Sequence, residues 1–144
     1  MSMSIGICPI TQTVGKRVDS ATLKSMLAVS LHEVQDIDYF FCRESNCEVV
    51  YFSADGKQVF KTHEVRERVF QKEPDSSDVL ICYCFRHTPG SIRAEIENTG
   101  GSTVVEDINQ GIKAGQCACD WRNPQGDCCL GNVSSLIKKY FPDL

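Results

Sequence analysis

The chain has 144 residues, of which 42% are hydrophobic and 24% are charged, and its formal net charge is −4. This length fits one domain or two very small ones, and the composition is that of a folded soluble protein. The negative charge gives no reason to expect nucleic-acid binding. No apolar run approaches the roughly 18 residues of a membrane span, so no membrane insertion is expected.

The first half of the chain reads as mostly strand. Residues 19–28 place apolar side chains at helical spacing after a polar start, which predicts one short helix. Residues 38–42 and 47–53 are aromatic and β-branched and flank a polar tetrapeptide, which predicts a β-hairpin. Asp55 and Gly56 indicate a turn, and a further strand is expected after it.

A polar segment at 71–78, with Pro, Ser and several charges, reads as a linker. It divides the chain into two expected units, residues 1–72 and residues 78–144. The second unit reads as three short helices. Thr88 is placed to cap the first of them, with Pro89 at its first position.

The first of these helices is expected to end at Gly100. The second is expected to begin at Ser102, with Thr103 and Glu106 at capping-box spacing. The third is expected within 131–142 and carries an apolar face. Three helices of this length bury little area, so something at their shared ends should help to hold them together.

The nine cysteines are the most informative feature of the sequence. The N-terminus has no basic leader before a long apolar stretch, so no signal peptide is expected and a cytoplasmic location follows. In that reducing compartment, clustered thiols favour metal binding or catalysis over structural disulfides. No C-x-x-C occurs, which argues against a thioredoxin-type redox motif.

Six cysteines lie in the second half and form two C-x-C pairs and one C-C pair: Cys82, Cys84, Cys117, Cys119, Cys128 and Cys129. A [2Fe–2S] cluster needs four thiolates, and two closely spaced sulfurs in a turn suit it because backbone N–H groups can point at them. Every cysteine is expected just before or after a helix and none within one. A Cys₄ zinc site and disulfides are the alternatives, although the usual C-x₂₋₄-C zinc spacing is absent.

The order of these motifs resembles the bacterioferritin-associated ferredoxin-like [2Fe–2S] domains. The loop at 119–129, with its Asn-Pro-x-Gly and C-C elements, resembles more closely the N-terminal region of archaeal copper chaperones of the CopZ type. Residues 39–52 also resemble the zinc region of that family. The resemblance implies an α+β protein, with a small zinc-ribbon-like β region followed by a small helical [2Fe–2S] domain.

By this resemblance, Cys82, Cys84 and Cys119 are three of the cluster ligands. Cys129 is preferred over Cys128 as the fourth, because apolar residues then follow at helical spacing. Cys117 and Cys128 are spare. They would replace a neighbouring ligand if the assignment is wrong by one or two positions. Otherwise they could form a free thiol pair for copper(I) binding or redox exchange.

Cys8, Cys42 and Cys47 of the first half are the expected zinc ligands, since a hairpin can gather them. Thr11 stands where related zinc domains carry a fourth cysteine. The fourth ligand could then be His32, His63, a carboxylate or water, and a domain without metal is the alternative. A three-ligand catalytic zinc is not favoured, because no general base lies nearby in the sequence.

Two further residues of the second half have open roles. Trp121, between two expected ligands, is interpreted either as a hydrophobic lid over the cluster or as a loop-packing residue. His87 could be a Rieske-type ligand, but a residue at the start of a helix is the simpler interpretation, since enough cysteines exist without it.

The sequence thus predicts a small iron–sulfur and zinc protein that carries electrons in copper or other metal handling. Its expected partner is a redox or copper-handling protein. The alternative is a metallochaperone or storage module that binds copper(I) or zinc through thiolates and transfers no electrons. An enzyme with a reactive thiol is not favoured, since no cysteine has a clear neighbouring base.

Overall fold

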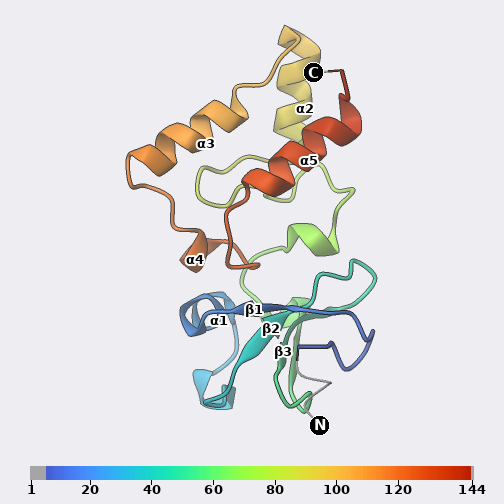
Figure 1. Ribbon diagram of the computed structural model, residues 1–144, viewed down its shortest axis with the longest axis vertical. Helices are drawn as coiled ribbons and strands as arrows, with labels where there is room; N and C mark the ends of the chain where they lie inside the picture. Colours follow the sequence, from blue (N-terminus) through green and yellow to red (C-terminus); the bar gives the residue numbers. More distant parts are fainter. Residues whose placement is uncertain (1–5, 144) are drawn as a thin grey trace.

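A computed structural model describes residues 6–143 of the chain. Residues 1–5, on which part of the reading of the N-terminus rests, and residue 144 lie outside the described residues. The fold is α+β, as expected: a small sheet forms one end of the molecule and three helices form the other (Figure 1). Within the described residues, no helix is both long and apolar enough to cross a membrane.

The sheet has four antiparallel strands in the order β1-β2-β3-β4. They are β1 (Lys16–Val18), β2 (Tyr39–Phe41), β3 (Val49–Ser53) and β4 (Val59–Lys61). The expected hairpin is confirmed as β2 and β3, and the expected later strand is β4. β1 was not predicted, because it has only three residues and two of them are charged.

One short helix, α1 (Ser20–Met26), follows β1 and confirms the prediction for 19–28. It buries Leu23 and Met26 against the sheet residues Phe41, Tyr51 and Phe60. Single 3₁₀ turns, η1 (Leu31–Glu33), η2 (Thr62–Glu64) and η3 (Phe70–Lys72), lie in the connections. η3 falls at the start of the expected linker.

The second half contains the three expected helices, α2 (Pro89–Thr99), α3 (Val104–Lys113) and α5 (Leu130–Tyr140). The Thr88 hydroxyl caps α2 by accepting from the Ser91 N–H, and α2 ends at Gly100 in the left-handed conformation. The expected capping box at Thr103 is wrong. The Glu95 carboxylate of α2 accepts from the Thr103 N–H and hydroxyl instead, at 2.9 and 2.6 Å.

A fourth helix of one turn, α4 (Cys119–Arg122), was not predicted. Cys119 is its first residue, so the expectation that no cysteine lies within a helix is wrong at this position. The segment is too short and too polar to show helical periodicity in the sequence. α4 lies between the sheet end and the other helices, next to α1 (Figure 1).

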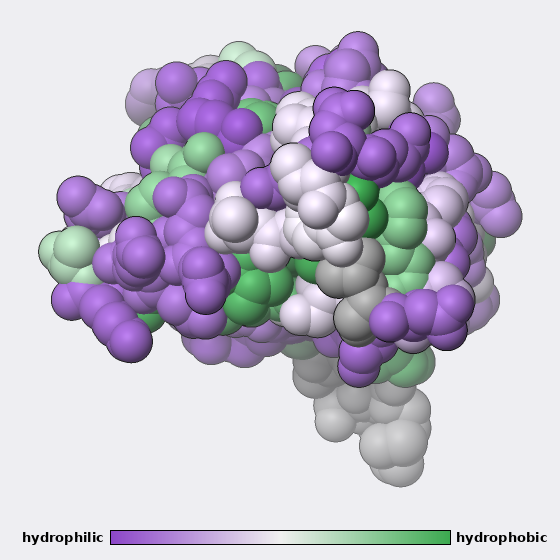
Figure 2. All heavy atoms as spheres, turned by 90° about the horizontal axis from the view of Figure 1, so that it is seen from above, coloured by the Kyte–Doolittle hydropathy of each residue, from purple (hydrophilic) through white to green (hydrophobic). Residues whose placement is uncertain are grey.

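Separate hydrophobic cores form in the two halves. The first lies between α1 and the sheet, and the second lies among α2, α3 and α5. The second core also contains the thiols of Cys82 and Cys129. Seen from the helical end, the surface is mostly hydrophilic, with hydrophobic residues in small patches between polar ones (Figure 2).

The contact between Gly111 of α3 and the Phe85 ring allows a first prediction. A Cβ added at Gly111 would lie 2.0 Å from the ring, so the ring or the backbone around it must shift. We expect Gly111→Ala to lower the free energy of unfolding by about 1–3 kcal/mol, a cost typical of overpacking. Gly131→Ala in α5 is the control, because nothing lies within 4 Å of its added Cβ. Urea unfolding of both variants measures the difference, and equal stability would contradict the packing described.

Candidate metal centres

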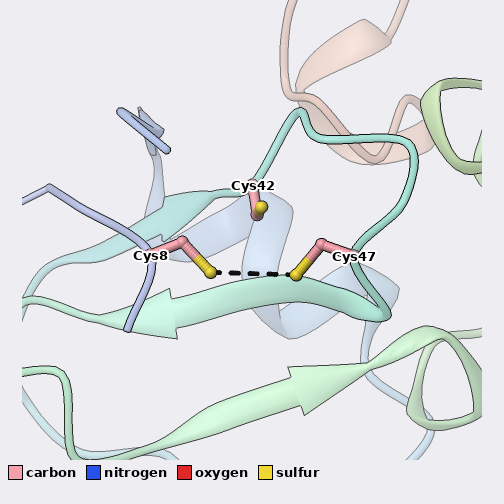
Figure 3. Close-up of side chains that lie close together, drawn as sticks. All are labelled: Cys8, Cys42 and Cys47. Atoms are coloured by element: carbon pink, nitrogen blue, oxygen red, sulfur yellow. Dashed lines mark hydrogen bonds between the residues drawn. The ribbon is translucent and has the colours of Figure 1, made fainter. Parts of the chain in front are cut away.

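Three cysteines from the first half point their sulfur atoms at one another (Figure 3). Cys8 begins a turn in which its N–H and C=O bond with Thr13 and Gln12, Cys42 directly follows β2, and Cys47 precedes β3 by two residues. The three sulfurs lie within 4.8 Å of one another, and the side chains are at most 3% exposed. Three buried thiols at this separation form a metal-binding group.

Thr11 lies next to this group. Its Oγ1 is 3.9 Å from the Cys42 Sγ, the same distance that separates the Cys8 and Cys47 sulfurs. Within the described part of the chain, no histidine or carboxylate joins the three cysteines. The two histidines considered as fourth ligands are therefore not brought to the site. Burial raises the pKa of the Cys42 thiol.

Sequence reasoning missed Lys72, which approaches the three thiols from η3. Its Nζ donates to the Glu44 carbonyl at 2.8 Å, two residues beyond Cys42. Burial lowers the pKa of Lys72, and attraction to Cys42 and Cys47 opposes that effect. A lysine 30 positions beyond Cys42 gives no sequence signal, because only the folding of the linker over the hairpin tip brings the two together.

A second thiol group joins the loop before α2 to the loop around α4. The Sγ atoms of Cys84 and Cys119 are 3.6 Å apart, and the Cys84 Sγ accepts from the Ala118 N–H at 3.2 Å. Cys82 and Cys129 are buried in the core of this half. The structure therefore brings Cys84 and Cys119 into contact, and the set of four cysteines stays a prediction, since among the described residues only Cys8, Cys42 and Cys47 have three ligand atoms within 4.8 Å of one another.

The pKa values of the second group shift in both directions. The neighbouring Cys129 thiol, and to a smaller extent the backbone N–H groups of Phe85 and Cys84, lower the pKa of Cys82 to about 6 against the effect of burial. The Cys129 thiol also lowers the pKa of Cys119 to about 6. Burial raises the pKa of Cys84 to about 12, and the thiols of Cys119 and Cys82 raise the pKa of Cys129. Metal binding here releases protons, because all ligands must become thiolates.

The two spare cysteines lie outside this group. Cys117 and Cys128 are solvent-exposed, whereas Cys82 and Cys129 are buried and Cys84 is half-buried. All nine cysteines lie in the described residues, and none forms a disulfide.

The other two residues with open roles lie at the edge of the second group. Trp121 is 59% exposed, which is not the position of a lid over thiols. The His87 ring contacts Asp107 at 2.7 Å. The backbone of His87 pairs with that of Cys82 and closes the turn that carries Cys84. His87 therefore fits the simpler interpretation, a residue that leads into α2.

Comparisons with known proteins agree with this geometry. A family model named zf_CopZ and described as a zinc binding domain matches residues 5–66. The copper chaperone CopZ of Archaeoglobus fulgidus is 34% identical over 129 residues, which cover 90% of this chain and 60% of that protein. The crystal structure of the N-terminal domain of the same CopZ superposes with a TM-score of 0.73 at 32% identity, covering 90% of this chain and 96% of that domain. The chain belongs to the family of CopZ N-terminal domains.

Membership in the CopZ family confirms the resemblance inferred from the loop at 119–129 and from residues 39–52. The zinc binding domain model spans all three cysteines of the first group. The chain spans about 60% of the length of the curated CopZ that it matches, so the activity of that whole protein is not transferred to it. The resemblance of the second half to bacterioferritin-associated ferredoxin-like domains stays a prediction.

Proposed function

We propose that this chain is a thiolate metal-binding protein of copper handling. In this proposal it holds zinc at Cys8, Cys42 and Cys47 and a second metal group at the four cysteines of the second half. The observation that carries the proposal is the convergence of three buried thiols in a region that matches a zinc binding domain. The sequence favoured an electron carrier over a metallochaperone or storage module. The metallochaperone or storage module is now the better supported of the two.

The first group fits zinc in both chemistry and spacing. Zn²⁺ binds thiolates at about 2.3 Å, which places the sulfurs of a tetrahedral site about 3.8 Å apart. The Cys8 and Cys47 sulfurs, at 3.9 Å, match this edge. The three cysteines would supply three corners and leave the corner next to Thr11 to a weak ligand or water. An open corner suits a metal that exchanges, as handling requires, better than a closed structural site.

A second candidate function is electron transfer by a [2Fe–2S] cluster bound to Cys82, Cys84, Cys119 and Cys129. The specific observation in its favour is the contact between the Cys84 and Cys119 sulfurs, with the Ala118 N–H donating to Cys84 and with Cys82 and Cys129 buried in the core of the same half. Such a cluster supplies one-electron chemistry, and hydrogen bonds to its sulfurs tune its potential. The same four thiolates also suit copper(I), which soft ligands select.

The wider setting belongs to the same proposal. The partner would be a copper-handling or redox protein, and the location would be the cytoplasm, whose reducing conditions keep the exposed Cys117 and Cys128 as thiols. No role as an enzyme by itself is proposed. The division into units 1–72 and 78–144 is also proposed, supported by the separate cores of the two halves.

One anaerobic preparation tests the proposal. Zinc, copper, iron and acid-labile sulfide are measured per chain, together with the visible spectrum. About one zinc with copper(I) at the second group and no colour supports the metallochaperone. About two irons and two sulfides with visible charge-transfer bands supports the cluster. Protein that takes up neither zinc nor any other metal under reducing conditions contradicts the proposal.

A prediction about Lys72 follows from the zinc assignment. Zn²⁺ with three thiolates carries a net charge of −1, and the Lys72 ammonium lies against it. We expect Lys72→Met to weaken zinc binding about tenfold, because the charge of a partly buried site loses its partner. Lys24→Met is the matched control, an exposed lysine of α1 with the same change of charge. Competition with a chromophoric chelator measures both affinities, and equal values for the two variants would count against this role of Lys72.

A further inference from the structure

The loop between Cys119 and Cys129 is held by the first half of the chain. The Tyr51 hydroxyl of β3 donates to the Pro124 carbonyl at 2.5 Å, and the Thr22 hydroxyl of α1 donates to the Asp120 carbonyl at 2.5 Å. Tyr51 and Thr22 are at most 1% exposed. Because a buried hydroxyl needs a partner, these two bonds fix where the loop can lie.

Two further contacts hold the far side of the same loop. The Lys16 ammonium donates to the Gln125 carbonyl at 3.1 Å and pairs with the Asp127 carboxylate at 2.9 Å. Gly126 has a φ of 77°, and a Cβ there would come within 3.2 Å of the Thr22 hydroxyl. The loop therefore rests closely on α1 and on β1, with a glycine at the point of contact.

Asn123 gives the loop its own shape. Its side chain is 1% exposed, donates to the Asp127 carbonyl and accepts from the Gln125 N–H. The loop is thus braced internally by Asn123 and placed from outside by Tyr51 and Thr22. Its two ends are Cys119 and Cys129, whose separation from Cys82 and Cys84 decides whether four thiolates reach one metal group.

We propose that Tyr51 and Thr22 are positioning residues for the metal group at Cys82, Cys84, Cys119 and Cys129. The sheet of the first half then serves as a template for ligands of the second half. This inference rests on the proposed function, since it assumes that the four cysteines bind metal. Outer-shell residues that orient metal ligands without binding the metal commonly change metal affinity by about ten- to a hundredfold.

The test compares Tyr51→Phe and Thr22→Val with Tyr39→Phe. Tyr39 is the matched control. It is 2% exposed in the same sheet, and its hydroxyl bonds to Gln58 and to the Gln35 N–H rather than to the loop. A chelator is added to the metal-loaded full chain, and release from the second group is followed by absorbance or metal assay. We expect release to be at least about tenfold faster in Tyr51→Phe and Thr22→Val, and within about twofold of wild type in Tyr39→Phe.

Thermal unfolding of the three variants is measured alongside, so that general destabilisation is separated from positioning. Equal release rates for Tyr51→Phe and Tyr39→Phe at similar melting temperatures would overturn the inference. Thr22→Val gives the same test if Tyr51→Phe does not fold.

Amide hydrogen exchange separates failure of this inference from failure of the proposed function. If wild-type protein binds no metal at the four cysteines, the proposed function is contradicted, but the positioning of the loop by Tyr51 and Thr22 is still open to test. Amide exchange at residues 120–127 tests that positioning directly. Faster exchange there in Tyr51→Phe, but not in Tyr39→Phe, supports positioning of the loop. Unchanged exchange in both variants overturns it.

Discussion

Cys129→Ser is expected to abolish metal binding at the second thiol group, and Cys128→Ser is expected to leave it intact. The two residues are adjacent, yet Cys129 is 1% exposed and shares the core of the second half with Cys82, whereas Cys128 faces solvent. Serine removes the soft thiolate and keeps the size of the side chain, so the comparison isolates the ligand. Metal analysis of the second group gives the result directly.

The same pair of variants is expected to differ in stability. Cys129 lies in the core formed by α2, α3 and α5, and metal-binding free energy contributes to folding in small domains. Loss of the metal should lower the melting temperature of the second half by more than about 10 °C in Cys129→Ser, with a loss of helical circular dichroism. Cys84→Ala is expected to behave in the same way. Full metal content and an unchanged melting curve in Cys129→Ser would contradict the ligand assignment.

Thr11→Cys is expected to tighten zinc binding at the first group by roughly a hundredfold. Four-ligand zinc sites bind with about 10–16 kcal/mol, or about 3 kcal/mol for each ligand, which corresponds to about a hundredfold in Kd. The Thr11 Oγ1 already lies 3.9 Å from the Cys42 Sγ, close to the edge of a tetrahedral zinc site. Zinc affinity is measured by competition with a chelator under reducing conditions.

Thr11→Val is the control for this substitution. It removes the hydroxyl and adds no ligand, so affinity should change little if the hydroxyl does not bind metal. The hydroxyl also accepts from Thr13 at 3.0 Å, so a small loss of stability is expected in this variant. Thr11→Cys with the affinity of wild type would show that Thr11 does not occupy the fourth corner.

Local patterns in the sequence predicted the longer elements well. Helices α2 and α5 have apolar residues at i, i+4 spacing, and strands β2 and β3 are almost wholly aromatic and β-branched. These patterns arise because one or both faces of the element are buried. They can therefore be recognised in the local sequence without knowing which segments pack against it. β1 and α4 were missed because each is short and its conformation depends on contacts with distant segments.

The candidate ligands were chosen on a different ground, and the four of the second half stay a prediction. Cysteine is rare, and its spacing along the chain limits which thiols can meet. The choice of Cys129 came from the apolar residues that follow it, and Val133 and Leu136 are indeed buried. The residues that surround the thiols were not predictable. Lys72, Tyr51 and Thr22 act across the fold, through contacts that no local pattern encodes.

In the proposed function, seven cysteines form two metal groups, and Cys117 and Cys128 belong to neither. Thiol alkylation of the metal-loaded native chain, read out for each cysteine by peptide mass spectrometry, tests it most directly. We expect rapid labelling of Cys117 and Cys128 alone, and faster labelling of the half-buried Cys84 and Cys119 once a chelator has removed the metal. Protection of Cys117 or Cys128 by metal, or rapid labelling of any of the other seven in the loaded protein, would contradict it.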